Sequence, residues 1–381
     1  MFHRLDKPLL MLSILFTILG LVMILSASSV STVLMYEVSS SYFFNRQLII
    51  MIASYIIGLF ILRIPLSRYK FFIPFYTISV IIFLIVVKTY GVIVNGAQSW
   101  ISLGFFNLQP SEFAKTAIIL FMAYFYEVSL KKEKPLWYNS LPLLVSFIML
   151  VLVVSQPDLG GAIIIAGITF LIYMKIPFSK KDKLIIYKIL GALVVIFALV
   201  YAYKGTSILS AHQLARLNYQ NPCTRYEENT GYQVCNGFIA IHNGGLTGLG
   251  LGNSTQKYLY LPEAHTDFIF PILVEELGVI LAIIIILLYL YMLYRILAIA
   301  KKADSIRNTI ICYGTFVYLS LHLIVNFMGV LALIPLTGVP LPFLSYGGSF
   351  NINVVIMIFM VLRVSIETSI NDERRAIRNI R

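Results

Sequence analysis

A carboxylate stands at the start of a long apolar run in the last third of the sequence. Asp267 lies in the stretch AHTDFIF, directly after a polar segment. A carboxylate at the boundary between water and lipid lies where the polar headgroup of a lipid would lie. There it can act as a general base toward a hydroxyl group. For Thr266 or Asp267 the plainer alternative is a helix cap, which satisfies the first amide groups of the helix.

Two more carboxylates follow within the same apolar run. Glu275 and Glu276 lie on helix faces about 100° apart, so at least one is expected to face the interior of a helix bundle. Its expected partner there is Lys115, His322 or Asn326. A packing role is the simplest interpretation for that glutamate.

Charge also occurs at two other places beside apolar runs. Glu112 and Lys115 are three residues apart, so they share a helix face and can pair. An ionisable side chain at mid-span costs about 2.5–3.5 kcal/mol, so we expect the pair to form. A structural ion pair and a role in binding an anionic substrate both remain open. Asp158, in the turn QPDLGG, can be a helix cap or a functional carboxylate.

The elements that position these residues are membrane spans. Of the 381 residues, 59% are hydrophobic and only 12% are charged, which excludes an ordinary soluble domain. A span needs about 20 apolar residues as helix. We therefore predict an all-α polytopic membrane protein, with residues 1–381 forming a single membrane domain of ten transmembrane helices. Their approximate limits are 8–27, 47–65, 71–90, 111–130, 140–156, 159–175, 184–203, 267–294, 308–333 and 350–367.

The basic residues predict the orientation of these spans. Lys and Arg concentrate in the loops of the side that carries both termini, which indicates that this side is cytoplasmic. One long extracytoplasmic loop, about 204–266, then joins helices 7 and 8, and a short cytoplasmic tail covers about 368–381. The net charge of +12 belongs to short loops beside spans, where orientation and anionic headgroups explain it. We therefore expect no nucleic-acid partner.

The long outer loop has two notable features. Cys223 and Cys235 both lie in it, where the redox environment permits a disulfide; two free thiols are the alternative. The stretch 236–256 is dense in glycine. It could form a phosphate-binding nest, but a tight re-entrant or surface segment that needs positive φ and close packing is the simpler interpretation.

Two shorter segments are expected on the same outer side. NGAQSWISLGFFNLQPSEFAK (95–115) is amphipathic, and Trp100 is suited to the membrane interface. Within it we expect a helix to start with Ser111 as the cap and Glu112 in the first turn. IPLTGVPLPFLSYGGSF (334–350) is rich in proline and glycine and cannot form continuous helix. Irregular backbone at this depth must be buried in protein or line a wet cavity.

Four stretches together resemble the SEDS family (shape, elongation, division and sporulation) in order and in side of the membrane. They are NGAQSWISLGFFNLQPSEFAK, QPDLGGA, GGLTGLGLGNSTQKYLYLPEAHTDFIF with the following EELG, and IPLTGVPLPFLSYGGS. The resemblance implies a peptidoglycan glycosyltransferase that polymerises lipid II into β-1,4 glycan strands at the outer face of the bacterial cytoplasmic membrane, for cell division or elongation.

The resemblance also implies a site. The family's essential aspartate corresponds to Asp267, the expected catalytic residue. Many relatives carry a basic residue in the stretch that matches 97–100, where this chain has none. Lys115 therefore becomes the expected cation for the pyrophosphate. The other residues expected to bind substrate are Glu112, Trp100, Gln109, Ser111, Asp158, His265, Thr266, Ser345 and Gly347.

The expected cofactor is a divalent cation, Mg or Mn, with ligands that the sequence leaves unknown. The expected partners are lipid II, a class B penicillin-binding protein with transpeptidase activity, and proteins of a division or elongation complex.

Two other functions remain as alternatives. A lipid II flippase would use the same polar residues to gate passage. Its path should carry polar residues through the full depth of the membrane, whereas the motifs found here cluster on the outer half. A non-catalytic scaffold for a transpeptidase is the third option, and under it Asp267→Ala should leave function intact.

Overall fold

The structure is a computed structural model that describes residues 2–94, 97–102, 104, 106–188, 191 and 218–380. Within these residues, eight helices are long and apolar enough to cross a membrane, and α7 is a shorter apolar helix. The bundle helices are α1 (Lys7–Leu34), α2 (Tyr42–Arg63), α3 (Phe72–Tyr90), α4 (Pro110–Lys131), α6 (Leu141–Val154), α7 (Leu159–Lys175), α11 (Ile269–Lys302), α12 (Ile306–Val330) and α13 (Gly348–Ile380). The shorter elements are η1 (Phe2–Arg4), η2 (Leu66–Phe71), α5 (Leu136–Asn139), η4 (Pro222–Arg225), α10 (Asn229–Gly244), β1 (Val92–Val94), β2 (Ala97–Ser102) and β3 (Asn107–Leu108).

The helical membrane fold is confirmed, and the bundle helices match all the predicted spans but one. That one, 184–203, falls mostly outside the described residues, although residues 180–188 are helical. One detail differs from expectation. The outer segment after α3 folds into a small antiparallel sheet in the order β1-β2-β3, so the fold is not purely helical. Residues 368–380, the predicted tail, are helical and continue α13.

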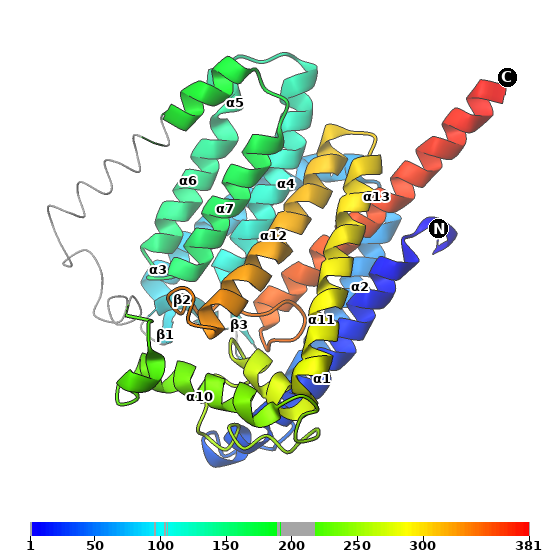
Figure 1. The fold of residues 1–381 in the computed structure, drawn as a ribbon. Helices are drawn as coiled ribbons and strands as arrows, with labels where there is room; N and C mark the ends of the chain where they lie inside the picture. The colour runs from blue at the N-terminus through cyan, green and yellow to red at the C-terminus, as the bar shows by residue number, and fades with distance from the viewer. Residues whose placement is uncertain are drawn as a thin grey trace, which may run out of the picture.

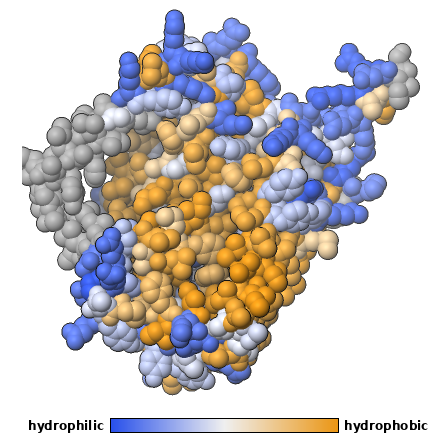
Figure 2. Space-filling model, viewed as in Figure 1, coloured by the Kyte–Doolittle hydropathy of each residue, from blue (hydrophilic) through white to orange (hydrophobic). Residues whose placement is uncertain are grey.

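The helices form one bundle whose two ends differ in character (Figure 1). The N- and C-terminal segments lie at one end, where Arg4 pairs with Glu373 at 2.6 Å and Asp304 pairs with Arg375 at 2.8 Å. The sheet and α10 lie at the other end. Figure 2 shows a wide hydrophobic band across the bundle, with hydrophilic residues gathered toward both ends. This is the surface expected of a protein that crosses a bilayer.

Helix α11 is broken near its outer end. Gly278 adopts φ 81° and ψ 165° inside it, so the backbone groups around it lose their helical partners. The glycine-rich loop after α10 supplies new ones. Leu249 and Gly250 donate their amides to the carbonyls of Glu275 and Glu276, at 2.9 and 3.0 Å. Val279 and Ile280 donate theirs to the carbonyls of Gly245 and Leu246, at 3.0 and 3.2 Å.

The close approach of these two segments requires glycine. A Cβ on Gly244 would lie 2.2 Å from the carbonyl oxygen of Val274, and a Cβ on Gly248 would lie 2.3 Å from that of Glu276. Gly248 also has φ +80°, which favours glycine. The expectation of a tight, closely packed segment is therefore confirmed. Two amides of this loop are engaged by α11, which argues against a phosphate nest.

This docking can be tested with two glycines of the same loop. Gly248→Ala would place a methyl group against rigid backbone, so we expect a clear drop in thermal stability of the purified protein in detergent. Gly252→Ala is the matched control, because Gly252 has φ +84° and open space around it. It carries only the left-handed backbone cost of about 1–2 kcal/mol. Equal losses in the two variants would contradict the docking.

Candidate functional site

Asp267 lies just ahead of α11 and does not cap it. The helix begins at Ile269, its cap residue is Phe268, and no side chain forms a cap hydrogen bond there. The side-chain amide of Asn326, on α12, donates to the backbone carbonyl of Asp267 at 2.9 Å. Asp267 Oδ2 lies 3.7 Å from the position that a Cβ on Gly338 would occupy. The carboxylate therefore lies beside Gly338 of the 331–347 segment, and the cap alternative is wrong.

A second carboxylate converges on the same point. The hydroxyl of Thr266 lies 2.5 Å from Glu263 Oε2 and 3.2 Å from Asp267 Oδ1. Glu263 itself has a positive φ of 55°, a backbone conformation that is uncommon for residues other than glycine. Thr266 thus links Glu263 and Asp267 at the outer edge of α11. Glu263 was not among the expected site residues, although it lies within the matched segment PEAHTD.

An aromatic and cationic wall stands beside these carboxylates. The ring of His265 stacks on Phe43, with centroids 4.5 Å apart, and Phe43 contacts Tyr346 edge-on at 4.8 Å. The guanidinium of Arg46 lies over the ring of Tyr42 at 4.5 Å and also interacts with Tyr346. Arg46 was not among the expected site residues. The available signal was its place among the few basic residues on the outer side.

Burial shifts the acid–base behaviour of this wall. Desolvation lowers the pKa of His265, and the charge of Glu263 only partly offsets that effect. Desolvation raises the pKa of Tyr346, against the opposing influence of Arg46. The pKa of Tyr36 is also raised, first by burial and then by Glu263. The imidazole is therefore neutral at pH 7.

Asp158 belongs to a second polar group, which joins three helix starts. Its Oδ1 accepts from the amide of Gly161 at 2.8 Å, as a cap of α7. Its Oδ2 accepts from the Ser111 hydroxyl at 2.9 Å and from the Gln109 side chain at 3.4 Å. The amide of Gln109 donates to the hydroxyl of Ser349 at the start of α13, at 2.9 Å. The group ties α4, α7 and α13 together.

The start of α4 corrects one expectation. Gln109 occupies the cap position, Pro110 begins the helix and Glu112 lies in the first turn. Ser111 is therefore not the cap, and its hydroxyl serves Asp158 instead. Proline explains the shift, because it has no amide hydrogen to lose and its fixed φ suits the first helical position.

Lys115 forms the expected ion pair within the bundle. Its ammonium lies 2.6 Å from Glu112 Oε1 and 3.2 Å from Nε2 of His322, whose other ring nitrogen lies 3.2 Å from the carbonyl of Pro340. The Lys115 side chain is only 1% exposed. The geometry therefore supports the structural interpretation, in which a buried chain of contacts anchors the 331–347 segment to α4 and α12.

The remaining expected substrate residues lie in turns and in the sheet. Ser345 is buried and closes a turn, since its hydroxyl accepts from the amide of Leu341 at 2.8 Å. Gly347 donates its amide to the side chain of Gln47 at 3.3 Å. Trp100 lies in β2, opposite Val92. Ser345 and Gly347 thus have structural contacts on either side of Tyr346, and Trp100 belongs to the sheet.

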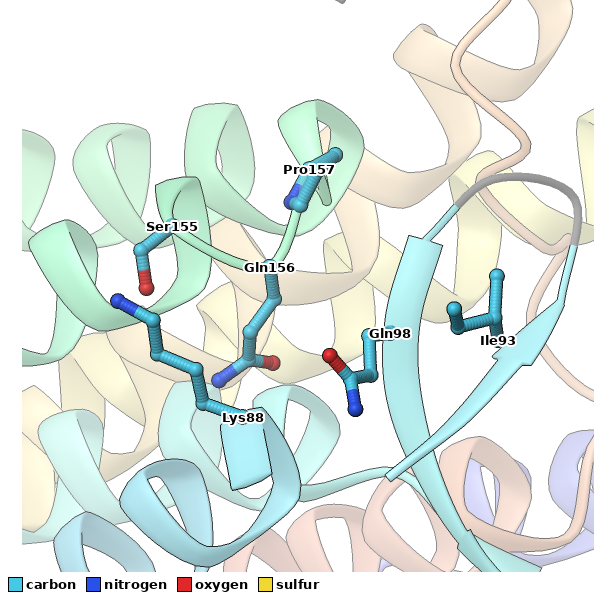
Figure 3. Close-up of a pocket in the computed structure, with 6 residues that line it drawn as sticks. All are labelled: Lys88, Ile93, Gln98, Ser155, Gln156 and Pro157. Atoms are coloured by element: carbon cyan, nitrogen blue, oxygen red, sulfur yellow. The ribbon is translucent and has the colours of Figure 1, made fainter. Parts of the chain in front are cut away.

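A cavity of about 210 Å³ lies beside the sheet, at the outer ends of α3 and α6 (Figure 3). Its lining includes Lys88, Gln98 and Gln156. The hydroxyl of Ser99 donates to the carbonyl of Gln156 at 3.3 Å, which joins the sheet to the turn that carries Asp158. The cavity is therefore a neighbour of the Asp158 group.

Glu275 and Glu276 do not face Lys115, His322 or Asn326, so that expectation is wrong. Glu275 accepts from the hydroxyls of Ser254 and Thr255, the latter at 2.7 Å. Glu276 Oε1 accepts from Lys257 at 3.1 Å and from Ser26 of α1 at 2.5 Å. Both glutamates are essentially fully buried. Glu275 and Glu276 therefore hold the outer loop against α11. The loop lies there because it pairs with the backbone on both sides of the break at Gly278, and helix periodicity alone does not predict that break.

The outer loop is also closed by a covalent link. Cys223 of η4 and Cys235 of α10 form a disulfide, as the sequence permits, and Cys312 is a buried free cysteine. Across the described ranges, no group of three or more His, Cys, Asp or Glu side chains is placed to hold a metal ion.

Comparison with known proteins identifies the family. The model of a cell cycle protein family, that of FtsW, RodA and SpoVE, matches residues 6–370. The chain belongs to this family. The probable peptidoglycan glycosyltransferase FtsW of Bacillus subtilis is 36% identical, covering 90% of this chain and 86% of the relative. Stage V sporulation protein E of the same organism is 32% identical, covering 94% and 96%.

Solved structures of the family share the fold. A chain of a peptidoglycan synthase complex aligns with a TM-score of 0.74 at 22% identity and covers 96% of this chain and 98% of that chain. Thermus thermophilus RodA aligns with a TM-score of 0.66 at 24% identity, with coverage of 95% and 96%. This family member therefore has the architecture of its solved relatives.

The buried clamp of this family member can be tested through the Lys257–Glu276 pair. Removing one partner of a buried ion pair costs about 3–5 kcal/mol, so we expect Lys257→Met and Glu276→Gln each to lower the thermal stability strongly. The double variant should lose less than the sum of the two. The exposed pair of Arg4 and Glu373 is the control; its removal should cost about 0–1 kcal/mol. Strictly additive effects at Lys257 and Glu276 would contradict the clamp.

The buried imidazole predicts a pH dependence. The pKa of His265 is lowered in the folded protein, so the unfolded chain binds the proton more readily. Stability from this residue is complete above about pH 6.5, the ordinary His value, and is lost as the pH falls toward the folded pKa. We expect His265→Gln to flatten the fall in melting temperature below that pH. An unchanged slope would show that other groups cause it.

Proposed function

We propose that this protein is a peptidoglycan glycosyltransferase that polymerises lipid II into β-1,4 glycan strands. Membership of the family supports this proposal, as does the activity named for its FtsW relatives. The structural observation that carries it is the placement of Asp267. The carboxylate is fixed at the outer lip of α11, does not cap that helix, and lies beside Glu263 and close to the wall that holds Arg46.

In the proposed reaction Asp267 acts as the general base. It removes the proton of the acceptor's 4-hydroxyl, and the oxygen attacks the anomeric carbon of the donor sugar. The bond from that carbon to the undecaprenyl pyrophosphate breaks, and the pyrophosphate leaves with the electron pair. Attack from the opposite face converts an α-linked donor into a β-linked product. The leaving group already carries two phosphates, so it needs charge stabilisation more than a proton.

Arg46 is the better placed cation for that charge. Its guanidinium is half-buried in the wall with His265 and Tyr346, and the planar group of arginine matches phosphate oxygens in pairs. The ammonium of Lys115 is enclosed by Glu112 and His322. We therefore assign Lys115 the task of holding the 331–347 segment in place behind Asp267.

The described residues can bind a divalent cation only if the substrate supplies part of its ligands. Magnesium is commonly bound by one or two carboxylates plus the phosphates of the substrate. Glu263 and Asp267 converge on Thr266 and can supply those two carboxylates. A cation bound there would neutralise the pyrophosphate. In this arrangement Glu263 and Asp267 would bind the cation and so orient the substrate, and Asp267 accepts the proton of the acceptor hydroxyl.

The orientation and the partners follow from the same proposal. Both termini face the cytoplasm and the site faces outward, because basic residues concentrate at the end of the bundle that carries the termini. The glycan strands then form at the outer face of the membrane, where a class B penicillin-binding protein of a division or elongation complex can crosslink them. The flippase alternative gains no support from the buried charges of Lys115 and Glu112, since these two side chains pair with each other near the outer end of α4.

The test is polymerisation by the purified protein. Supplied with lipid II, Mg²⁺ or Mn²⁺ and a class B penicillin-binding protein, it should form glycan chains. Asp267→Asn should reduce the rate by at least about a hundredfold, the usual contribution of a general base. Its abundance and melting temperature should match the parent protein.

Glu227→Gln is the control, because this carboxylate lies exposed on the same outer loop; it should polymerise normally. Normal chains from Asp267→Asn would remove this residue from the mechanism. Movement of labelled lipid II across liposomes without any polymer would support the flippase instead.

A further inference from the structure

A groove lies at the end of the bundle that carries the termini, far from the proposed active site. It has a volume of about 400 Å³ and runs between η2, α3, α4, α5 and the start of α12. In Figure 1 α5 lies at the end of the bundle opposite α10. The lining combines basic and aromatic side chains, among them Lys70, Phe121, Phe125, Lys131, Tyr138 and Arg307.

The polar side of this groove carries a surplus of positive charge. Lys70, Lys131 and Arg307 line it, against the single carboxylate of Glu127. Glu127 already accepts from Lys131 at 3.0 Å and from Arg307 at 3.1 Å. Lys70 lies with its ammonium 4.7 Å from the ring centroid of Phe71. Arg307 also lies 3.9 Å from Glu367, which does not line the groove. The lining itself therefore carries more positive than negative charge and favours an anionic ligand.

The other part of the groove lining is apolar. Ile73, Phe121, Phe125 and Val128 form this wall. Beside the groove, Phe71 is 71% exposed and Trp137 is 75% exposed. Exposed aromatic residues of this kind mark the level of lipid headgroups. The groove therefore combines cations at headgroup depth with a hydrophobic surface that continues into the hydrocarbon region.

We propose that this groove binds an anionic phospholipid from the leaflet on the side of the termini. The phosphate lies between Lys70 and Lys131, and one acyl chain lies along Phe121 and Phe125. Tyr138 also lines the groove and adds a hydroxyl group to its polar side. Basic pockets between spans are suited to anionic headgroups. This site is independent of glycosyl transfer, and it would make the stability of the protein depend on lipid charge.

The experiment uses the purified full-length protein in a zwitterionic detergent. Native mass spectrometry counts retained lipid, and thermal unfolding reports binding, with phosphatidylglycerol, phosphatidylcholine of the same chains and inorganic phosphate as probes. We expect phosphatidylglycerol alone to be retained and to raise the melting temperature. Lys70→Gln with Lys131→Gln should weaken this binding about 30-fold, since each basic residue near the headgroup contributes about a factor of five.

The matched control removes two charges elsewhere at the same end. Lys301 and Lys302 are exposed in the last turn of α11, so Lys301→Gln with Lys302→Gln should leave binding unchanged. Both pairs are exposed at the surface, and the melting temperature without lipid checks that each double variant folds. An equal loss in the control, or equal retention of phosphatidylcholine, would overturn the proposal. Saturation by inorganic phosphate alone, at the same affinity, would also overturn it in favour of a free phosphate site.

Discussion

The fold of the outer half depends on how a broken membrane helix satisfies its backbone. Unpaired amides and carbonyls are expensive at membrane depth, and the break at Gly278 creates several in α11. Four hydrogen bonds to the glycine-rich loop satisfy them. Side-chain contacts bind the same loop to α11: Lys257 pairs with Glu276, and Thr255 donates to Glu275. The result is a rigid outer half of α11 with Asp267 just ahead of it.

The irregular 331–347 segment is the second support of the site. Two side chains of α12 fix this segment. His322 contacts the carbonyl of Pro340, and Asn326 donates to the carbonyls of Val339 and Asp267. Gly338, with φ +69°, allows the segment to pass close to the Asp267 carboxylate. Buried polar side chains in this bundle therefore position backbone, which fits the general rule that irregular structure in a membrane must be enclosed by protein.

The sequence predicted what depends on local composition. Span limits follow from runs of apolar residues, and the ion pair of Glu112 with Lys115 follows from their spacing. Asp267 was singled out because a carboxylate at the mouth of a span is costly. The partners of Glu275 and Glu276, and the placement of Arg46 and Glu263, depend on contacts between distant segments. No periodicity encodes the break at Gly278 that decides them. The small sheet was missed because its strands are only two to six residues long.

The hydroxyl of Thr266 carries one hydrogen yet lies within reach of two acids. It can serve only one of them at a time, so the two carboxylates are chemically unequal even though they are neighbours. A rotation of the Thr266 hydroxyl would move its hydrogen bond from one carboxylate to the other without any movement of the backbone. A substrate hydroxyl arriving in the same space would compete with Thr266 for these two acceptors.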